Sequence, residues 1–168
     1  MKEDRCAGAI LEDDRSHPLI SVVMSCFNDE HCVAAAVRSI QAQSLGDWEL
    51  IAVNDGSTDR TGPILDELSS AHSRIRVIHQ NNEGLTTALI AGCKQATGRF
   101  IARHDADDLS LPQRFEKQAE VLTRDSCVGF VSCWADSFTA DGATLDSIRP
   151  SDTPDLATKR LLDERQGP

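Results

Sequence analysis

The sequence predicts an α/β domain with a mostly parallel central sheet and helices on both of its faces. Continuous apolar runs rich in β-branched residues occur at 19–25 and 48–54, as expected for strands that are buried on both faces. Each run precedes a segment with helical apolar spacing, so strand and helix alternate along most of the chain. This alternation is typical of repeated βαβ units.

The first half of the chain contains two such units. The run LISVVMS at 19–25 predicts a strand, and a helix is expected from Asp29 to a break near 45–47. Apolar residues of this helix fall on one stripe: Val33, Ala36, Val37 and Ile40. WELIAVN at 48–54 predicts the second strand. After a turn, a helix is predicted over 63–72, with three residues facing the core: Ile64, Leu65 and Leu68.

The next unit begins with RIRVIH at 74–79, a predicted strand. Gly84 is expected to open a helix that Gly98 ends. The residues expected on its buried face are Leu85, Ala88, Leu89, Gly92 and Ala96. RFIARH at 99–104 predicts the fourth strand of the sheet.

The remaining elements are predicted from start signals and turn residues. Ser110 offers a capping hydroxyl, with Pro112 in the first turn and Gln113 at the capping-box position, for a helix that ends near Arg124. A fifth strand is expected over 127–138 and a turn with a short edge strand over 139–148. A charged helix is predicted over 153–165.

Length and charge restrict the class of protein. A chain of 168 residues suits one domain, taken as 18–168, after a leader at 1–17 that we expect to be mobile. The formal charge of −10 argues against a protein that binds nucleic acid by neutralising phosphates. Six cysteines without a C-x-x-C pair predict buried free thiols. The charged leader resembles neither a signal peptide nor a membrane span, so we expect a cytoplasmic protein, and peripheral attachment to the inner membrane face is compatible with that.

Polar clusters follow three of the predicted strands, at 25–28, 54–57 and 105–108. Ligands of parallel sheets bind beyond the carboxyl ends of the strands, where these clusters are expected to meet. Asp105 and Asp107 are two positions apart, so an extended backbone would direct both carboxylates to one side, where they could hold Mg²⁺ or Mn²⁺. The alternative is a solvated turn that caps the helix at Ser110.

Other ligand motifs fit less well. An EF-hand loop from Asp105 would need Gly in place of Ser110 and an oxygen ligand in place of Leu109. The first strand is followed by neither a G-x-G-x-x-G turn nor a P-loop, so phosphates lack a glycine-rich cradle. Metal bridging of an anionic ligand is therefore favoured.

Single residues at these strand ends allow two interpretations each. Asp55 could accept a hydrogen bond from a ring N–H or a ribose hydroxyl, or it could form a turn with Gly56. Phe27 could stack on a base or belong to the core. Arg103 and His104 are interpreted as charge-balancing or exposed residues, and His104 is not assigned as a general base.

Three blocks together, PLISVVMSCFND, WELIAVNDGSTDRT and NNEGLTTALIAGCKQATGRFIARHDADDLSLPQRFEKQ, resemble family 2 glycosyltransferases. The resemblance covers roughly residues 18–138 and implies a Rossmann-like GT-A fold. It also implies transfer of a sugar from a nucleotide diphosphate donor, often linked to UDP, with inversion and a divalent ion. The acceptor could be a glycan, a lipid-linked sugar or a protein.

The resemblance also implies roles for individual residues. Residues implied to line the base pocket or contact the nucleoside are Ser25, Phe27 and Asp55. Asn82 and Gly84 match the loop that borders the donor. Asp105 is implied to approach the ribose or the metal, Asp107 to bind the metal, and Asp108 to be a further candidate.

The sequence departs from the family pattern in several places. Asn54 stands where an aspartate often precedes Asp55, and Leu89-Ile90 replaces a pair that often includes Arg or Asn. Asp163-Glu164 does not match the acidic pair that supplies the general base. We therefore expect the chain to be the donor-binding part of a longer, truncated enzyme, inactive alone if the base is absent. A non-catalytic nucleotide-binding module is the alternative, whereas a nucleotidyltransferase would need a glycine-rich loop after the first strand.

Overall fold

The computed structural model describes residues 17–139 and 144–148, which fall into two compact units with a boundary between Glu120 and Val121. The domain limits predicted from the sequence stay a prediction. In chain order, the elements up to the boundary helix are β1 Ile20–Cys26, α1 Val33–Gln41, β2 Trp48–Asp55, α2 Thr61–Ala71, β3 Ile75–Gln80, α3 Leu85–Gln95, β4 Phe100–Asp105 and α4 Arg114–Arg124. Among the described residues, no helix combines the length and apolar character needed to cross a membrane.

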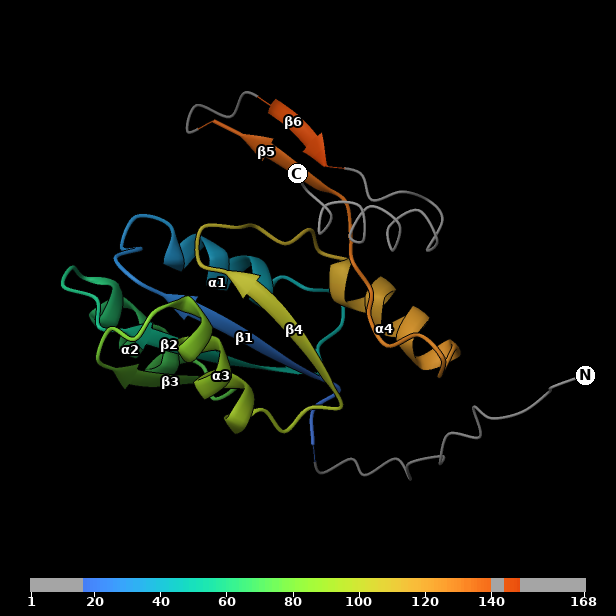
Figure 1. The fold of residues 1–168 in the computed structure, drawn as a ribbon, viewed down its shortest axis with the longest axis horizontal. Helices are drawn as coiled ribbons and strands as arrows, with labels where there is room; N and C mark the ends of the chain where they lie inside the picture. The colour runs from blue at the N-terminus through green and yellow to red at the C-terminus, as the bar shows by residue number, and fades with distance from the viewer. Residues whose placement is uncertain (1–16, 140–143, 149–168) are drawn as a thin grey trace, which may run out of the picture. The chain divides into compact units, whose positions relative to one another are not determined.

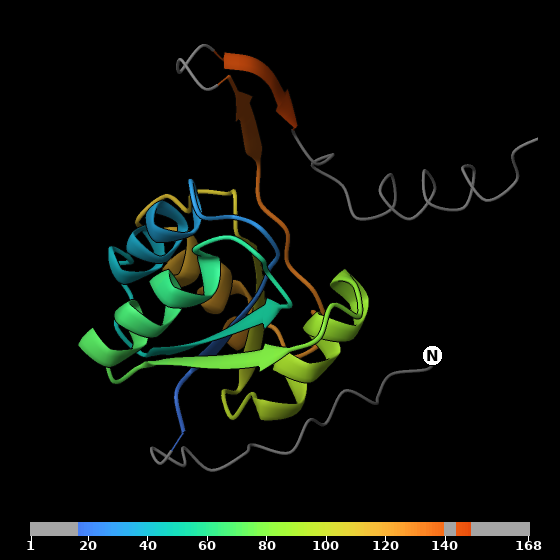
Figure 2. The same cartoon turned by 90° about the vertical axis from the view of Figure 1, so that its left-hand side faces the viewer.

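The first unit is built on a four-stranded parallel sheet with the order β3-β2-β1-β4. Helices cover both of its faces, as Figures 1 and 2 show. Val22 and Val23 are adjacent on β1 and point to opposite faces, yet both are buried, which requires cover on each side. The predicted parallel α/β architecture is confirmed.

Two apolar clusters fill the space between sheet and helices. On one face, Met24 and Leu50 pack with Ile40 of α1 and Phe115 of α4. On the other face, Ile51 and Val53 of β2 pack with Ala88 of α3. Burial of a large apolar side chain contributes about 1.5–3 kcal/mol, so the larger cluster provides most of the apolar stabilisation of this unit.

The stripe predicted for α1 is buried, and in the stripe predicted for α2 Leu65 is buried while Ile64 and Leu68 are partly buried against the core, but the starts of both helices differ from the prediction. All four predicted α1 residues are fully buried, yet this helix begins at Val33 because the segment from Asp29 forms a turn. Helix α2 begins at Thr61 and not at 63. Pro63 is tolerated inside the first turn, where backbone N–H groups lack helical partners anyway.

Helix α3 buries a narrower face than the sequence predicted. Gly84 precedes it with a φ of 87°, a backbone conformation that suits glycine, so the predicted opening is confirmed. Ala88 and Gly92 are buried, but Leu85 is 51% exposed, which is a correction to its expected core position. The helix ends at Gln95, three residues before Gly98, so Gly98 is not its C-terminal cap.

The start of α4 is set by side chains from α1 and the loop after it. The helix begins at Arg114 and not at Ser110, which corrects the predicted start. The Ser110 N–H donates to Ser39 Oγ at 3.0 Å, and the Phe115 N–H donates to Gln43 Oε1 at 3.0 Å. A partner distant in sequence therefore takes up the Ser110 N–H, which a local capping box would have satisfied, and another takes up the Phe115 N–H in the first turn of the helix.

The second unit contains an antiparallel hairpin of β5 Ala135–Phe138 and β6 Thr144–Ile148. The predicted strand over 127–138 is too long, because β6 provides partners only for its last four residues. The expected edge strand within 139–148 is confirmed. The helix predicted over 153–165 lies outside the described residues.

The prediction of buried thiols holds only for Cys26 among the described cysteines. Cys93 and Cys133 are exposed and Cys32 is half-buried, so the prediction is wrong for them. Burial raises the pKa of the Cys26 thiol, and the nearby Asp29 and Cys32 raise it further. Cys26 is therefore a neutral core residue and not an activated nucleophile.

Gly98 lies against β1 where the chain enters β4, and this contact gives a test of the fold. A Cβ at position 98 would lie 2.5 Å from the Ser21 backbone nitrogen. We expect Gly98→Ala to destabilise the protein by about 1–3 kcal/mol, because backbone must move to admit the methyl group. Thermal unfolding measures the effect. Gly46→Ala is the control, since a Cβ there meets nothing within 4 Å, and equal melting temperatures for both variants would contradict the packing.

Candidate functional site

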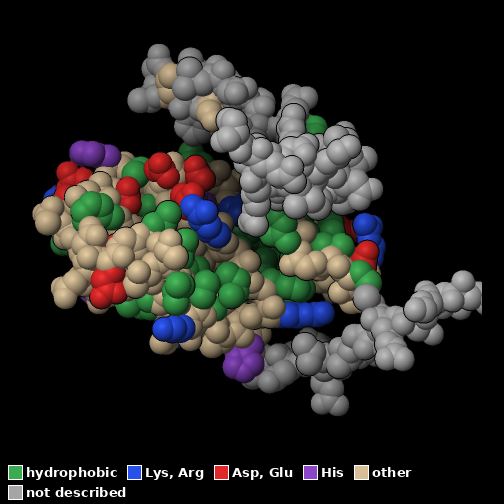
Figure 3. All heavy atoms as spheres, viewed as in Figure 1, with side chains coloured by type: hydrophobic (Ala, Val, Ile, Leu, Met, Phe, Trp, Pro, Cys, Tyr) green, Lys and Arg blue, Asp and Glu red, His purple; other side chains and the backbone are tan. Residues whose placement is uncertain are grey.

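The polar clusters predicted at the strand ends do lie along one edge of the sheet. Ser25 of β1 is in register with Val53 of β2 and Asp105 of β4. Asp55 at the end of β2 is in register with Gln80 of β3. Figure 3 shows acidic side chains gathered at the end of this unit to which the strand arrows of Figure 1 point. The carboxyl ends of the parallel strands therefore form an acidic rim.

Asp55 is the most buried carboxylate of this rim, with 2% of its surface exposed. Its oxygens accept hydrogen bonds from the Glu83 N–H at 2.9 Å, the Gly84 N–H at 2.8 Å and Gln80 Nε2 at 2.7 Å. Desolvation opposes ionisation, but these bonds prevail and lower the pKa of Asp55. Asp55 thus anchors the loop between β3 and α3, and its predicted contact with a nucleoside stays a prediction.

The loops after β1 and β2 are joined by side-chain to backbone hydrogen bonds in both directions. The Asp29 N–H donates to Thr61 Oγ1 at 2.7 Å, and the Glu30 N–H donates to Asp59 Oδ2 at 3.1 Å. In the other direction, the Thr58 N–H donates to Asn28 Oδ1 at 2.9 Å. Asn28 has a φ of 59°, a left-handed conformation that asparagine tolerates. These bonds give the rim a defined backbone shape.

The residues implied to border a nucleoside lie at this same edge but differ in exposure. Phe27 is 47% exposed, so the alternative core position is wrong and its ring is available for stacking. Ser25 is half-buried, and Asn82 is exposed. The loop of Asn82 runs close to Gly56, where an added Cβ would lie 2.5 Å from the Asn82 nitrogen. The turn after β2 and the loop after β3 are thus in direct contact.

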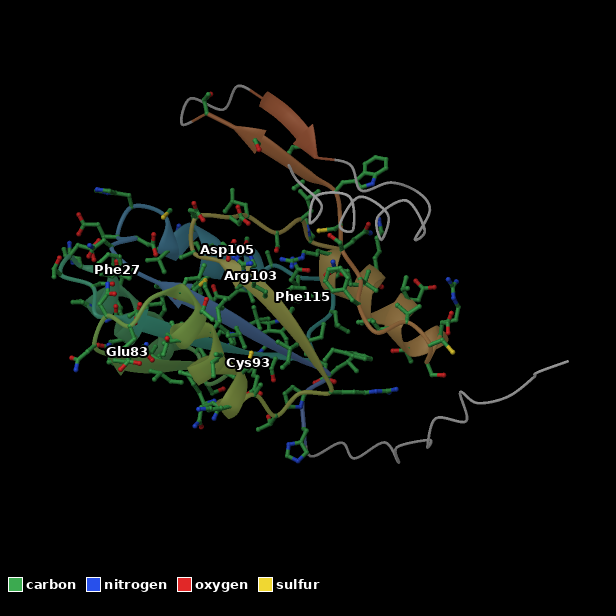
Figure 4. All side chains as sticks on the ribbon, viewed as in Figure 1. Phe27, Glu83, Cys93, Arg103, Asp105 and Phe115 are labelled. Atoms are coloured by element: carbon green, nitrogen blue, oxygen red, sulfur yellow. The ribbon has the colours of Figure 1, made fainter. Side chains whose placement is uncertain are left out.

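Asp105 ends β4 and pairs with Arg103 on the same face of the strand, as the labelled side chains in Figure 4 show. Arg103 Nε and Nη2 each donate to one Asp105 oxygen at 3.0 Å, which bears out the charge-balancing interpretation of Arg103. The predicted extended geometry ends here, because a turn begins at Ala106. Asp107 therefore does not continue the alternation of β4, which corrects the reasoning that placed both carboxylates on one side.

Two further carboxylates, those of Asp107 and Asp29, lie near each other at the rim. Asp107 is exposed and has no hydrogen-bond or ion-pair partner among the described residues. Burial raises the pKa of Asp29, the Phe27 N–H opposes this, and the charges of Asp107 and Asp59 raise it further. Sequence reasoning missed Asp29, although its position directly after β1 was a usable signal.

This donor set fits a hard divalent cation. Exposed carboxylate oxygens are the ligands that Mg²⁺ and Mn²⁺ prefer, and a cation would relieve the repulsion felt by Asp29. Asp105 keeps further lone-pair sites beside its bonds to Arg103. A group of three or more metal-binding side chains is not present in the described part of the chain, so remaining positions would fall to the ligand or to water.

Asn54 and His104 are held by local partners, and Asn54 Oδ1 accepts a hydrogen bond from the Ser57 N–H at 3.2 Å in the turn after β2. Asn54 Nδ2 lies 3.0 Å from His79 Nδ1, and His79 Nε2 lies 2.9 Å from Asp66 Oδ1. The departure at Asn54 therefore serves the contact between β2, β3 and α2. His104 is 2% exposed, which contradicts an exposed position, and its Nδ1 lies 2.8 Å from the Asp105 carbonyl oxygen.

An open groove of about 460 Å³ runs beside Arg103 along α3. Its lining residues are Leu85, Thr86, Leu89, Ile90, Cys93, Lys94 and Arg103. The Leu89-Ile90 departure thus contributes apolar surface next to the ion pair of Arg103. Leu85 and Ile90 face this open groove, and they are therefore about half exposed although α3 packs against the sheet.

The contacts of Asp55 predict a pH-dependent effect of Asp55→Asn. The amide NH₂ cannot accept from the loop N–H groups, which we expect to cost about 1–3 kcal/mol. Because the folded pKa is lowered, the contribution of Asp55 is complete above its unfolded value of about 3.9 and is lost as the pH falls through the folded pKa. Urea unfolding should therefore show a gap between wild type and variant at pH 7 that narrows at pH 3.

The control for this measurement is Asp47→Asn, because the Asp47 side chain is exposed at the opposite end of the sheet. It should leave the free energy of unfolding unchanged at both pH values. A gap for Asp55→Asn that stays constant between pH 7 and pH 3 would contradict the assigned hydrogen bonds.

Comparison with curated proteins finds sugar transferases of bacterial origin. A putative glycosyltransferase of Bacillus subtilis, EpsE, is 41% identical over 111 residues, which span 65% of this chain and 40% of EpsE. The Escherichia coli protein WfgD, a UDP-Glc:α-D-GlcNAc-diphosphoundecaprenol β-1,3-glucosyltransferase, is 32% identical over 64% of this chain and 42% of its own length. The chain thus spans less than half the length of either relative.

Solved structures with the same fold include TarS and a mannosyltransferase. Staphylococcus aureus TarS, residues 1–349 in complex with UDP-GlcNAc, matches with a TM-score of 0.58 and 24% identity over 62% of this chain and 31% of that structure. The mannosyltransferase PcManGT of Pyrobaculum calidifontis, in complex with GDP-Man and Mn²⁺, matches with a TM-score of 0.52 and 22% identity over 55% of this chain and 28% of that structure.

These structural matches confirm the GT-A fold expected from the sequence. The family described as Glycosyl transferase family 2 matches residues 21–165, which include the whole acidic rim. Because this match spans most of the sequence, the chain belongs to glycosyl transferase family 2.

Proposed function

We propose that this chain binds a nucleotide-sugar donor, most simply a UDP-sugar, for metal-dependent transfer of the sugar to an acceptor hydroxyl with inversion. The observation that carries the proposal is the rim itself, where Asp107 remains exposed beside Asp29 at the carboxyl ends of parallel strands. Ligands of parallel α/β sheets bind at this edge. The complexes of TarS with UDP-GlcNAc and of PcManGT with GDP-Man support a nucleotide-sugar donor.

In this proposal the rim binds the donor through two groups of residues. Ser25 and the exposed ring of Phe27 border the base, and Asp55 contacts the nucleoside or holds the loop of Asn82 and Gly84 against it. Asp107, with Asp105 beside it, holds Mg²⁺ or Mn²⁺. Such an ion, when bound, offsets the charge on the diphosphate.

The acceptor, the general base and the cellular location stay predictions. Inverting transfer needs a base that removes the proton of the acceptor hydroxyl. His104 is not available for this role at the rim, because it is buried on the other side of β4. Asp55 is not available either, because its oxygens accept hydrogen bonds from the loop between β3 and α3. A cytoplasmic location, with or without attachment at the inner membrane face, is part of the proposal.

Thermal unfolding with UDP tests donor and metal binding. We expect UDP with Mn²⁺ to raise the melting temperature, since a ligand at 100 times its Kd adds about 2.7 kcal/mol of stability. Asp107→Asn should remove the part of the gain that depends on Mn²⁺, because it removes the exposed carboxylate ligand. Asp47→Asn removes the same charge at the other end of the sheet and should keep the full gain.

The result decides between the proposed function and its alternative. No shift in melting temperature with any nucleotide, with or without metal, would contradict donor binding. Stabilisation without release of UDP from UDP-sugars or of GDP from GDP-sugars, by this chain and by a longer form alike, would favour a non-catalytic module. Release of UDP that disappears in Asp107→Asn would support an active transferase.

A further inference from the structure

The segment from Asp105 to Asp108, here called the aspartate turn, carries three carboxylates, and its backbone is held in place by side chains outside it. Within the turn, the Asp108 N–H donates to the Asp105 carbonyl at 3.2 Å. The same carbonyl lies 2.8 Å from Nδ1 of the buried His104. The turn therefore has a defined shape although its carboxylates point to solvent or to Arg103.

Arg114, the first residue of α4, connects the two ends of this turn. Its Nη2 donates to the carbonyl of Arg103, before the turn, at 2.9 Å. Its Nη1 donates to Ser110 Oγ, after the turn, at 2.8 Å. A single planar guanidinium thus fixes the separation between β4 and the segment that leads into α4.

The far end of the connection is anchored to α1. The Ser110 N–H donates to Ser39 Oγ at 3.0 Å, and Ser39 Oγ in turn donates to the Ala36 carbonyl at 2.7 Å. Gln43 Nε2 donates to the Leu111 carbonyl at 2.8 Å. Arg114 therefore connects β4 to a segment that is itself hydrogen-bonded to α1. We call this set of hydrogen bonds the Arg114 bracket.

The acceptors of Arg114 distinguish a geometric role from a charge-balancing one. Both acceptors are neutral, a carbonyl and a hydroxyl, although three carboxylates lie nearby. Asp105 is already paired with Arg103, and Asp107 has no partner among the described residues. If Arg114 served mainly to neutralise the turn, its donors would be expected on a carboxylate.

We propose that Arg114 is a positioning residue of the candidate donor site, which holds the aspartate turn in the shape that presents Asp107 to a divalent cation and a nucleoside diphosphate. This inference rests on the proposed function. It assigns to Arg114 no contact with the donor, so its effect passes through the backbone of the turn. Lysine would keep the charge but not the fork, because its ammonium is a single point that cannot span both acceptors.

The test compares Arg114→Lys and Arg114→Met with wild type in two measurements. The first is amide hydrogen exchange at Asp108 and Ser110 without any ligand, which we expect to be at least tenfold faster in both variants. The second is the gain in melting temperature with UDP, with and without Mn²⁺. We expect the Mn²⁺-dependent part of the gain to be lost in both variants and the gain with UDP alone to be retained.

Two further variants serve as control and as independent confirmation. Lys117→Met removes one positive charge from the exposed side of the same helix and should change neither measurement. Ser39→Ala removes the acceptor of the Ser110 N–H from the α1 side and should reproduce the Arg114 variants with Arg114 intact. This second route keeps the test informative if an Arg114 variant fails to fold.

Each outcome decides a separate point. Unchanged amide exchange in Arg114→Lys would overturn the Arg114 bracket. Faster amide exchange together with an intact Mn²⁺-dependent gain in melting temperature would show that Arg114 has a structural role only. Rescue of both measurements by lysine would show that charge and not geometry matters, which also overturns the inference. If wild type shows no Mn²⁺-dependent gain, the proposed function fails, and with it the role of Arg114 at the donor site, whereas the exchange data still decide whether Arg114 holds the turn.

Discussion

A buried carboxylate at the end of the second strand determines how the candidate site is built. Asp55 has lost almost all contact with water, and burial of an unpaired charge costs several kcal/mol. The three donors that compensate this cost come from the end of β3 and from the loop that opens α3. The ionised form of Asp55 and the folded form of that loop are therefore stable only together.

The acidic residues of the rim fall into two groups, according to whether their carboxylates accept hydrogen bonds from backbone N–H groups. Asp55, Asp59 and Asp29 accept hydrogen bonds from backbone N–H groups in the loops after β1, β2 and β3. These carboxylates hold the backbone of the loops in a fixed shape at this edge of the sheet. The carboxylate of Asp107 makes no such bond among the described residues. A chain with a net charge of −10 thus uses part of its acidic surplus to shape the edge and leaves part of it accessible.

The sequence could predict the elements that depend on local periodicity but not those set by distant partners. The buried runs of β1 and β2 and the stripe of α1 follow from burial on fixed faces, so their pattern is visible in the letters. The start of α4 is not, because Gln43 and Ser39 take over its N–H groups across some seventy residues. Likewise, the letters DADD do not indicate that Asp105 forms an ion pair with Arg103. They also do not indicate that Asp29, from another loop, lies near Asp107.

The different surroundings of Asp105 and Asp107 rank them as cation ligands. Asp105 receives two charge-assisted bonds from Arg103, so much of its field is already neutralised, and a cation that approaches it also meets the positive guanidinium. Asp107 has no cationic partner among the described residues, and its charge is one of the causes of the raised pKa of Asp29. Coulombic attraction between unit charges at contact distance in partly exposed surroundings is on the order of 4 kcal/mol. In the proposed site a divalent ion would therefore gain most at Asp107, and Asp105 would be better placed to orient Arg103 than to act as the primary ligand.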